Sequence, residues 1–268
     1  MATGVSAQKA ARTPRMHDAL GTRLWWPWLL VGMAWALAAL ASMAGQRILI
    51  DHHYLLEESG LSWPVAAGVF LAGWQVMIAA MIPMCLPALA RANAPNGMHP
   101  HRAASMFLTG YAQVWTVFGL LAFTGDTLLH RLVDAWPWLA AHTFLIGAAT
   151  FAGAGLFQFS RWKAACLGAC RHPHAALGDG ALAGVRRAHW GGIWYGHAAA
   201  GCCWALMLVM FGVGVGGLGW MIGLTGAMLA ETLLPERWRA RQATGIVLLT
   251  LAALWLAHPT WLMVAAAL

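Results

Sequence analysis

Long apolar blocks separated by short polar connections dominate the chain. A helix needs about 20 mainly apolar residues to cross a hydrocarbon core about 30 Å thick. Seven blocks meet this requirement, at approximately residues 24–45, 64–89, 103–123, 136–159, 191–213, 218–234 and 243–265. The pattern predicts an all-α fold, a polytopic transmembrane helical bundle of about seven spans.

The sixth block is the shortest of the seven. It follows the glycine-rich run 212–219, so it could form a tight hairpin with the fifth span or be partly re-entrant. Six spans is therefore the competing count. In either case, residues 1–23 are expected to be an N-terminal segment, and residues 24–268 a single transmembrane domain with a Cys/His loop at 160–190.

The composition agrees with a membrane protein. Hydrophobic residues make up 60% of the chain and charged residues only 9%, whereas roughly 25% of the residues of an average soluble domain are charged. The net charge of +7 comes from Lys and Arg residues that we expect in the loops. This distribution indicates an anionic membrane face, and nucleic acid is not expected as a partner.

The charges of the loops predict the orientation, because Lys and Arg near span ends stay on the cytoplasmic side. With the N-terminus in the cytoplasm, fourteen of the 16 basic residues lie inside, and only Arg47 and Arg131 lie outside. The outer loops then carry Asp126 and Asp134, among other acids. The loop at 160–190 is therefore expected to be cytoplasmic.

Cysteines in this loop are candidate metal ligands. Cys166 and Cys170 are four residues apart, which on a helix places both sulfurs on one face. Neighbouring cations would lower the pKa of these thiols and favour the thiolate, and His172 and His174 could add imidazole nitrogen. The alternative is two unliganded cysteines in a basic loop.

Two spans carry sulfur stripes at helical spacing. The fifth contains Cys202 followed by Cys203, Met207 and Met210, and the second contains Met77, Met81, Met84 and Cys85. Thiolate and thioether are soft ligands that select Cu(I) over hard ions such as magnesium or calcium. The alternative is packing, since Met and free Cys fill buried gaps well.

Only two of the 12 histidines, His142 and His197, fall clearly within spans. Ionisable residues inside a membrane usually face the bundle interior and mark function. These two are candidate ligands or proton carriers, with a helix-to-helix hydrogen bond as the alternative. Facing histidines could also hold a b-type haem, so haem is not excluded.

Three segments resemble a bacterial family of predicted metal-binding integral membrane proteins, the domain of unknown function 2182. They are residues 74–84, residues 157–173, and the string Gly201-Cys202-Cys203-Trp204-Ala205-Leu206-Met207 followed by Glu231. The resemblance implies a metal site, copper being the leading ion, at the second span, the loop cysteines and the paired cysteines. It also implies the bacterial inner membrane. The family's run of methionines before the proline is altered here to Met81-Ile82-Pro83-Met84-Cys85.

The leading functional hypothesis is a membrane protein that binds Cu(I) and assists copper delivery or cuproenzyme maturation, without being an enzyme. Beyond the lipid bilayer, its partner would be a cuproenzyme or another membrane subunit. The alternatives are a membrane oxidoreductase subunit using haem, copper or thiols, and a non-catalytic assembly subunit. No catalytic residue is identified. The candidate metal ligands are Cys202, Cys203, Met207, Cys166, Cys170, Met77, Met81, Met84, Cys85 and His197.

Overall fold

A computed structural model describes residues 25–45, 55, 59–89, 99–173, 184–212 and 218–257. Within these residues the ordered elements are all helical, which confirms the all-α prediction. The predicted N-terminal segment, His174 and the end of the last predicted span lie outside the described residues.

A helix is present at each of the seven predicted spans. In chain order the helices are α2 (Trp26–Met43), α4 (Trp63–Ala80), α6 (Pro100–Ala135), α8 (Phe144–Phe157), α11 (Val185–Gly212), α12 (Leu218–Leu233) and α13 (Ala240–Ala257). Shorter elements between them are η2 (Ile82–Cys85), α5 (Leu86–Leu89), α7 (Pro137–Ala140), α9 (Arg161–Arg171) and η4 (Glu236–Trp238). Among the described residues, five helical segments are long and apolar enough to cross a membrane, whereas α8 and α12 are shorter apolar helices.

The second predicted span is not one continuous helix. Its α-helix stops at Ala80, and a 3-10 turn at η2 precedes the short α5. Pro83 explains the break, because proline has no N–H to donate and its ring clashes with the carbonyl four residues earlier. The expectation of an uninterrupted helix over residues 64–89 was therefore wrong.

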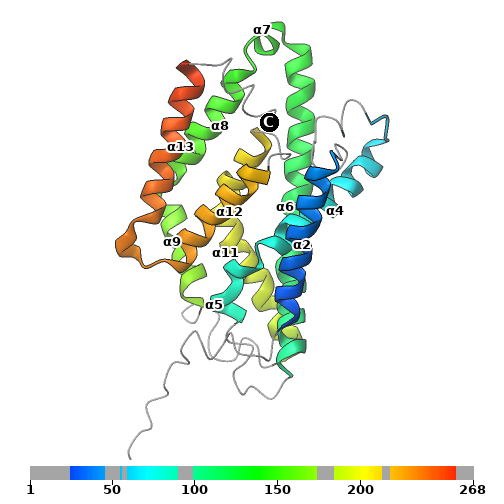
Figure 1. The fold of residues 1–268 in the computed structure, drawn as a ribbon, viewed down its shortest axis with the longest axis vertical. Coiled ribbons are helices and arrows are strands. Elements are labelled where there is room, and N and C mark those ends of the chain that lie inside the picture. Colours follow the sequence, from blue (N-terminus) through cyan, green and yellow to red (C-terminus); the bar gives the residue numbers. More distant parts are fainter. Residues whose placement is uncertain are drawn as a thin grey trace, which may run out of the picture.

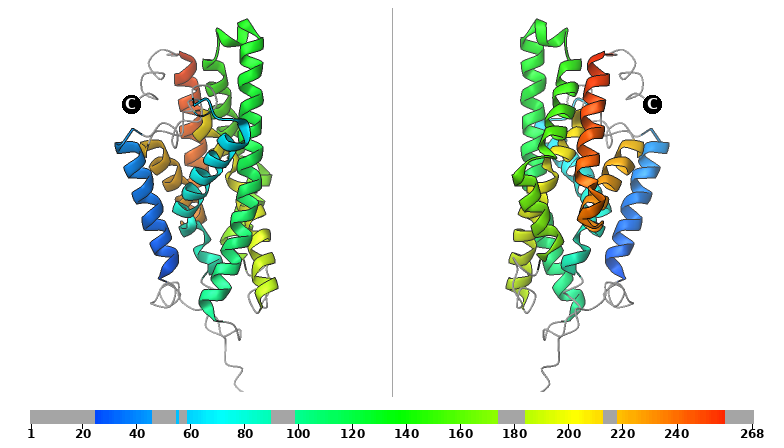
Figure 2. Two further views of the ribbon diagram at one scale, coloured as in Figure 1. Left: turned by 90° about the vertical axis from the view of Figure 1, so that its right-hand side faces the viewer. Right: turned by 90° about the vertical axis from the view of Figure 1, so that its left-hand side faces the viewer.

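Helix α6 is longer than predicted. It runs to Ala135 and extends past its neighbours at the end of the bundle that carries α7 (Figure 2). Asp126 and Asp134, predicted to lie in a loop, are therefore part of this helix.

The central pair of the bundle is α6 and α11, which cross with their backbones in contact. A methyl group at Gly192 would collide with the Phe107 carbonyl, and one at Gly110 would collide with the His189 carbonyl. Small residues permit this close approach. Helix α8 packs on α13 and α11, α2 packs on α4, and α12 contacts α2, α9, α13 and η2.

Successive connections between the helices lie at opposite ends of the bundle, as the predicted membrane topology requires. The beginnings of α2, α6 and α11 and the end of α5 gather at one end of the bundle, opposite α7 (Figure 1). Helix α9 lies toward this same end and packs against α11. The connection predicted as a Cys/His loop thus contains a helix that forms part of the bundle.

Candidate metal centre

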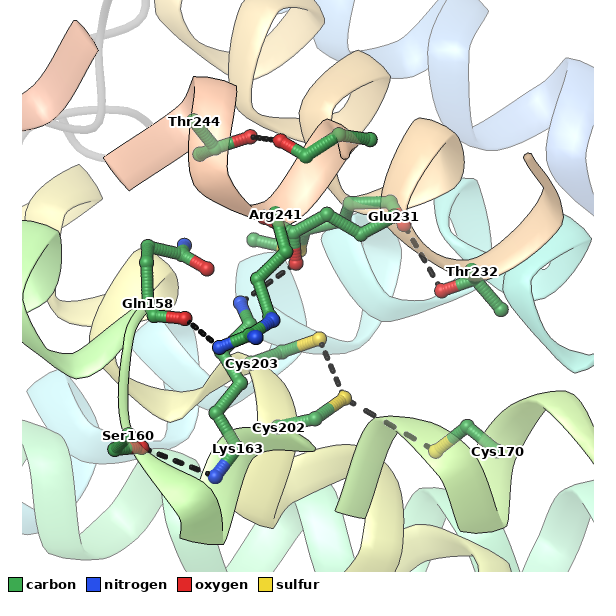
Figure 3. A network of polar contacts seen from close by, with 12 residues as sticks. Gln158, Ser160, Lys163, Cys170, Cys202, Cys203, Glu231, Thr232, Arg241 and Thr244 are labelled. Carbon is green, nitrogen blue, oxygen red and sulfur yellow. Dashed lines mark hydrogen bonds and ion pairs between the residues drawn. The ribbon is translucent and has the colours of Figure 1, made fainter. Parts of the chain in front are cut away.

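Two helices bring three cysteine sulfurs together in the interior. Helix α9 carries Cys170 and α11 carries Cys202 and Cys203, and all three side chains are buried. The Cys170 and Cys202 Sγ atoms are 4.0 Å apart, and the Cys202 and Cys203 Sγ atoms are 3.2 Å apart. Figure 3 shows Cys202 between the other two. All five cysteines of the chain are free thiols.

The start of α9 determines how this helix approaches α11. The Ser160 hydroxyl oxygen accepts a hydrogen bond from the Lys163 backbone N–H at 3.1 Å, which caps the helix. With α9 helical, Cys166 and Cys170 lie on one face, as predicted. This face meets α11 where Gly201 lacks a side chain, and an added methyl group there would be 2.7 Å from the Cys166 sulfur.

Cys166 is the one partly exposed cysteine of the five. Burial raises the pKa of its thiol, and the neighbouring Cys203 adds to the increase. The prediction that nearby cations would lower the pKa of this thiol was wrong, because desolvation outweighs them. His172 follows α9 and is exposed.

The predicted sulfur stripes lie in the same buried core as the cysteine cluster. Met77, Met81, Met84 and Cys85 belong to it, together with Cys170, Cys202, Cys203, Met207 and Met210. The Tyr195 hydroxyl joins the second and fifth spans by donating to the Met84 carbonyl at 2.8 Å and lies 3.4 Å from the Cys170 carbonyl. The side chain of Cys85 interacts with Tyr111. Packing alone would also bury these methionines. They are therefore weaker candidates for metal ligands than the clustered cysteines.

The two intramembrane histidine candidates lie apart from the cluster. His197 is on an exposed face of α11, and its Nδ1 is 2.9 Å from the Ile193 carbonyl oxygen. His142 is half-buried in the turn before α8, with its Nδ1 2.7 Å from the Trp138 carbonyl oxygen and its ring stacked on that indole. Neither ring is brought to the sulfurs.

A buried ion pair borders the cysteines and was missed in the sequence. Lys163 Nζ lies 2.6 Å from Glu231 Oε2, and the two side chains are 0% and 1% exposed. Lys163 was expected to lie in a loop, and this expectation was wrong, because it is buried on α9. The signal that could have revealed the pair is a carboxylate inside an apolar span, since such residues usually pair with a partner in the bundle.

Further polar groups surround this pair. The Arg171 guanidinium donates to the Glu231 backbone carbonyl from Nε at 2.8 Å, and Arg241 donates to the Gln158 carbonyl. The Gln158 amide is fully buried, without a hydrogen-bond partner for its side chain among the described residues. Figure 3 shows Lys163, Arg241 and Glu231 beside the cysteines. The centre is therefore a set of soft sulfurs next to a cationic group of side chains.

The sulfur geometry permits a shared ion. With metal–sulfur bonds of about 2.3 Å, sulfurs 4.0 Å apart can bind one ion at an S–metal–S angle of about 120°. Within the described part of the chain, no three His, Cys, Asp or Glu side chains form a complete metal site. The arrangement suits an ion of low coordination number, for which two or three soft ligands suffice.

Comparison with known proteins identifies a family. No curated protein and no solved structure matches the chain. A family described as "PpoB2: Copper chaperone" matches residues 71–255, which is 185 of the 268 residues. The segment includes all ten candidate ligands, and it agrees with the copper that the sequence resemblance implied. The chain belongs to this copper chaperone family.

Proposed function

We propose that the protein holds Cu(I) in the membrane at Cys170 and Cys202, with Cys203 as the adjacent ligand, and delivers it to a cuproenzyme or to another membrane subunit. The observation that carries this proposal is the 4.0 Å distance between sulfurs from two different helices. Membership of a copper chaperone family supports the choice of ion.

The donor set favours Cu(I) chemically. Thiolate and thioether sulfur are soft, and Cu(I) is the soft first-row ion that they select. Cys203 is next to Cys202, and Cys166 packs against the core that also contains Cys85, Met207 and the second-span methionines. The ion can then move by exchange of one sulfur ligand for the next.

Two groups of candidate ligands that lie apart in the sequence form one cluster in this proposal. Cys170 was expected in a cytoplasmic loop and Cys202 within the fifth span, yet their sulfurs are neighbours. Delivery in this proposal starts from one cluster, with Cys166 on its more exposed side. Cys166 is the ligand from which a partner would take the ion.

The test is metal content after purification in mild detergent under reducing conditions. We expect the parent to bind Cu(I), and Cys170→Ser and Cys202→Ser to weaken binding. Loss of a residue that merely supports a ligand weakens metal sites roughly 10–100-fold, so loss of a ligand should weaken binding at least as much. Ala198→Ser, which adds a hydroxyl on α11 and leaves every sulfur in place, is the matched control.

Four results would contradict the proposal. The parent could contain no copper, or both serine variants could retain the parental affinity. A haem absorption band in the parent would instead favour the oxidoreductase alternative. A stable complex without metal would favour the assembly subunit.

A further inference from the structure

The Lys163–Glu231 pair is an unusual feature of an apolar bundle. Both side chains are fully buried, and apart from this ion pair the Lys163 Nζ and Glu231 Oε1 atoms have no hydrogen-bond partner among the described residues. The desolvation of a buried pair often exceeds its attraction, and well-packed apolar residues are frequently as stable. The pair is therefore better explained by a task at the neighbouring cysteines than by fold stability.

Lys163 lies beside the cysteine sulfurs (Figure 3). It is close enough to interact electrostatically with both Cys202 and Cys203. Lys163 also belongs to α9, the helix that supplies Cys170. Arg171 and Arg241 lie around the same group of residues, and Arg171 is paired with Glu236 at 3.3 Å. Three cations against two carboxylates leave one net positive charge beside the cluster.

Loading of the proposed site creates an anion. Two neutral thiols bind one Cu⁺ as thiolates, and their two protons pass to the aqueous buffer. The product, a Cu(I) ion with two thiolates, carries one negative charge. A buried anion is strongly unfavourable unless a cation is close.

We infer that Lys163, held in position by Glu231, is the counter-cation of the Cu(I)–dithiolate and makes the site favour a monovalent over a divalent soft ion. A divalent ion such as Zn²⁺ with the same two thiolates is neutral, so it gains no attraction from the ammonium group. Lys163 is a positioning residue that touches no metal in this scheme. The inference rests on the proposed function and adds ion selectivity to it.

The experiment removes the charges and keeps the apolar volume. Lys163→Met combined with Glu231→Met leaves no unpaired buried charge, so this double variant is expected to fold with a melting temperature close to that of the parent. Affinities for Cu(I) and Zn²⁺ are measured by competition with chromophoric chelators. We expect Cu(I) binding to weaken at least tenfold, about 1.4 kcal/mol, with Zn²⁺ binding unchanged or stronger. Lys163→Arg, which retains the charge, should keep most of the Cu(I) affinity.

The outcomes separate this inference from the proposed function. A folded double variant with the parental ratio of Cu(I) to Zn²⁺ affinity overturns the inference alone. Equal losses for both ions also overturn it, because they indicate a structural role. A parent that binds no Cu(I), or that binds it independently of Cys170 and Cys202, overturns the proposed function as well.

Discussion

Gly201 is the residue at which the two cysteine-bearing helices meet. Its missing side chain leaves room for the Cys166 sulfur against α11, directly before Cys202 and Cys203 in sequence. The glycine thereby sets the distance between α9 and α11. This distance also determines the position of Cys170, four residues after Cys166.

Gly201→Ala is predicted to separate the helices. The added methyl would be 2.7 Å from the Cys166 sulfur, and overpacking of this kind costs typically about 1–3 kcal/mol. We expect a lower melting temperature in detergent and weaker Cu(I) binding. Gly168→Ala on α9 is the control, because nothing lies within 4 Å of its added methyl. Equal behaviour of the two variants would show that the contact does not position α9.

Cys166 differs from the other cysteines in its exposure. The other four are buried, and burial raises the pKa of the Cys166 thiol. Because the thiolate is the nucleophile, we predict slow alkylation by iodoacetamide at neutral pH and a rate that increases with pH until the raised pKa is passed. Mass spectrometry of the folded protein should find the label at Cys166 first. Rapid labelling at pH 7 would contradict the direction of the shift.

At the scale of elements, two features adjust otherwise regular spans. Pro83 ends α4 and produces η2, which places Met84 and Cys85 on a 3-10 turn. The Tyr195 hydroxyl of α11 then holds this turn through the Met84 carbonyl. The second span therefore presents its sulfur atoms from a fixed bend.

The crossing of α6 and α11 is the contact on which the arrangement of elements depends most. Gly192→Ala would place a methyl group against the Phe107 backbone carbonyl, which cannot move without shifting α6. We predict severe destabilisation, at the upper end of the roughly 1–3 kcal/mol typical of overpacking or beyond it, seen as a loss of monodisperse protein in size-exclusion chromatography. Gly125→Ala on α6 meets nothing within 4 Å and should behave like the parent.

At the scale of the whole molecule, the helix ends alternate between two faces. Because the predicted inside loops carry most of the positive charge, we predict that reporters fused at residue 1, or inserted near residues 95, 178 and 238, report the cytoplasm. A reporter inserted near residue 51 should report the opposite side. Alkaline phosphatase and fluorescent-protein fusions would measure this, and a cytoplasmic signal at residue 51 would contradict the orientation.

The helical class, the positions of the seven helices and the sulfur residues to consider could be read from the amino-acid sequence. Hydrophobic periodicity, block length and side-chain softness are local properties, and a local property can be read along the chain. The full length of α6, which continues to Ala135 beyond its apolar block, and the break at Pro83 were not predicted.

Tertiary structure decided which residues meet. Cys170 and Cys202 are separated by 32 positions, and Lys163 and Glu231 by 68, so only the packing of α9 and α12 around α11 makes them neighbours. The same packing turned His197 outward, since helical position alone does not specify which face a partner helix covers. Distances between sulfurs and the placement of charge are products of helix contacts, and these decide whether soft ligands form a shared site.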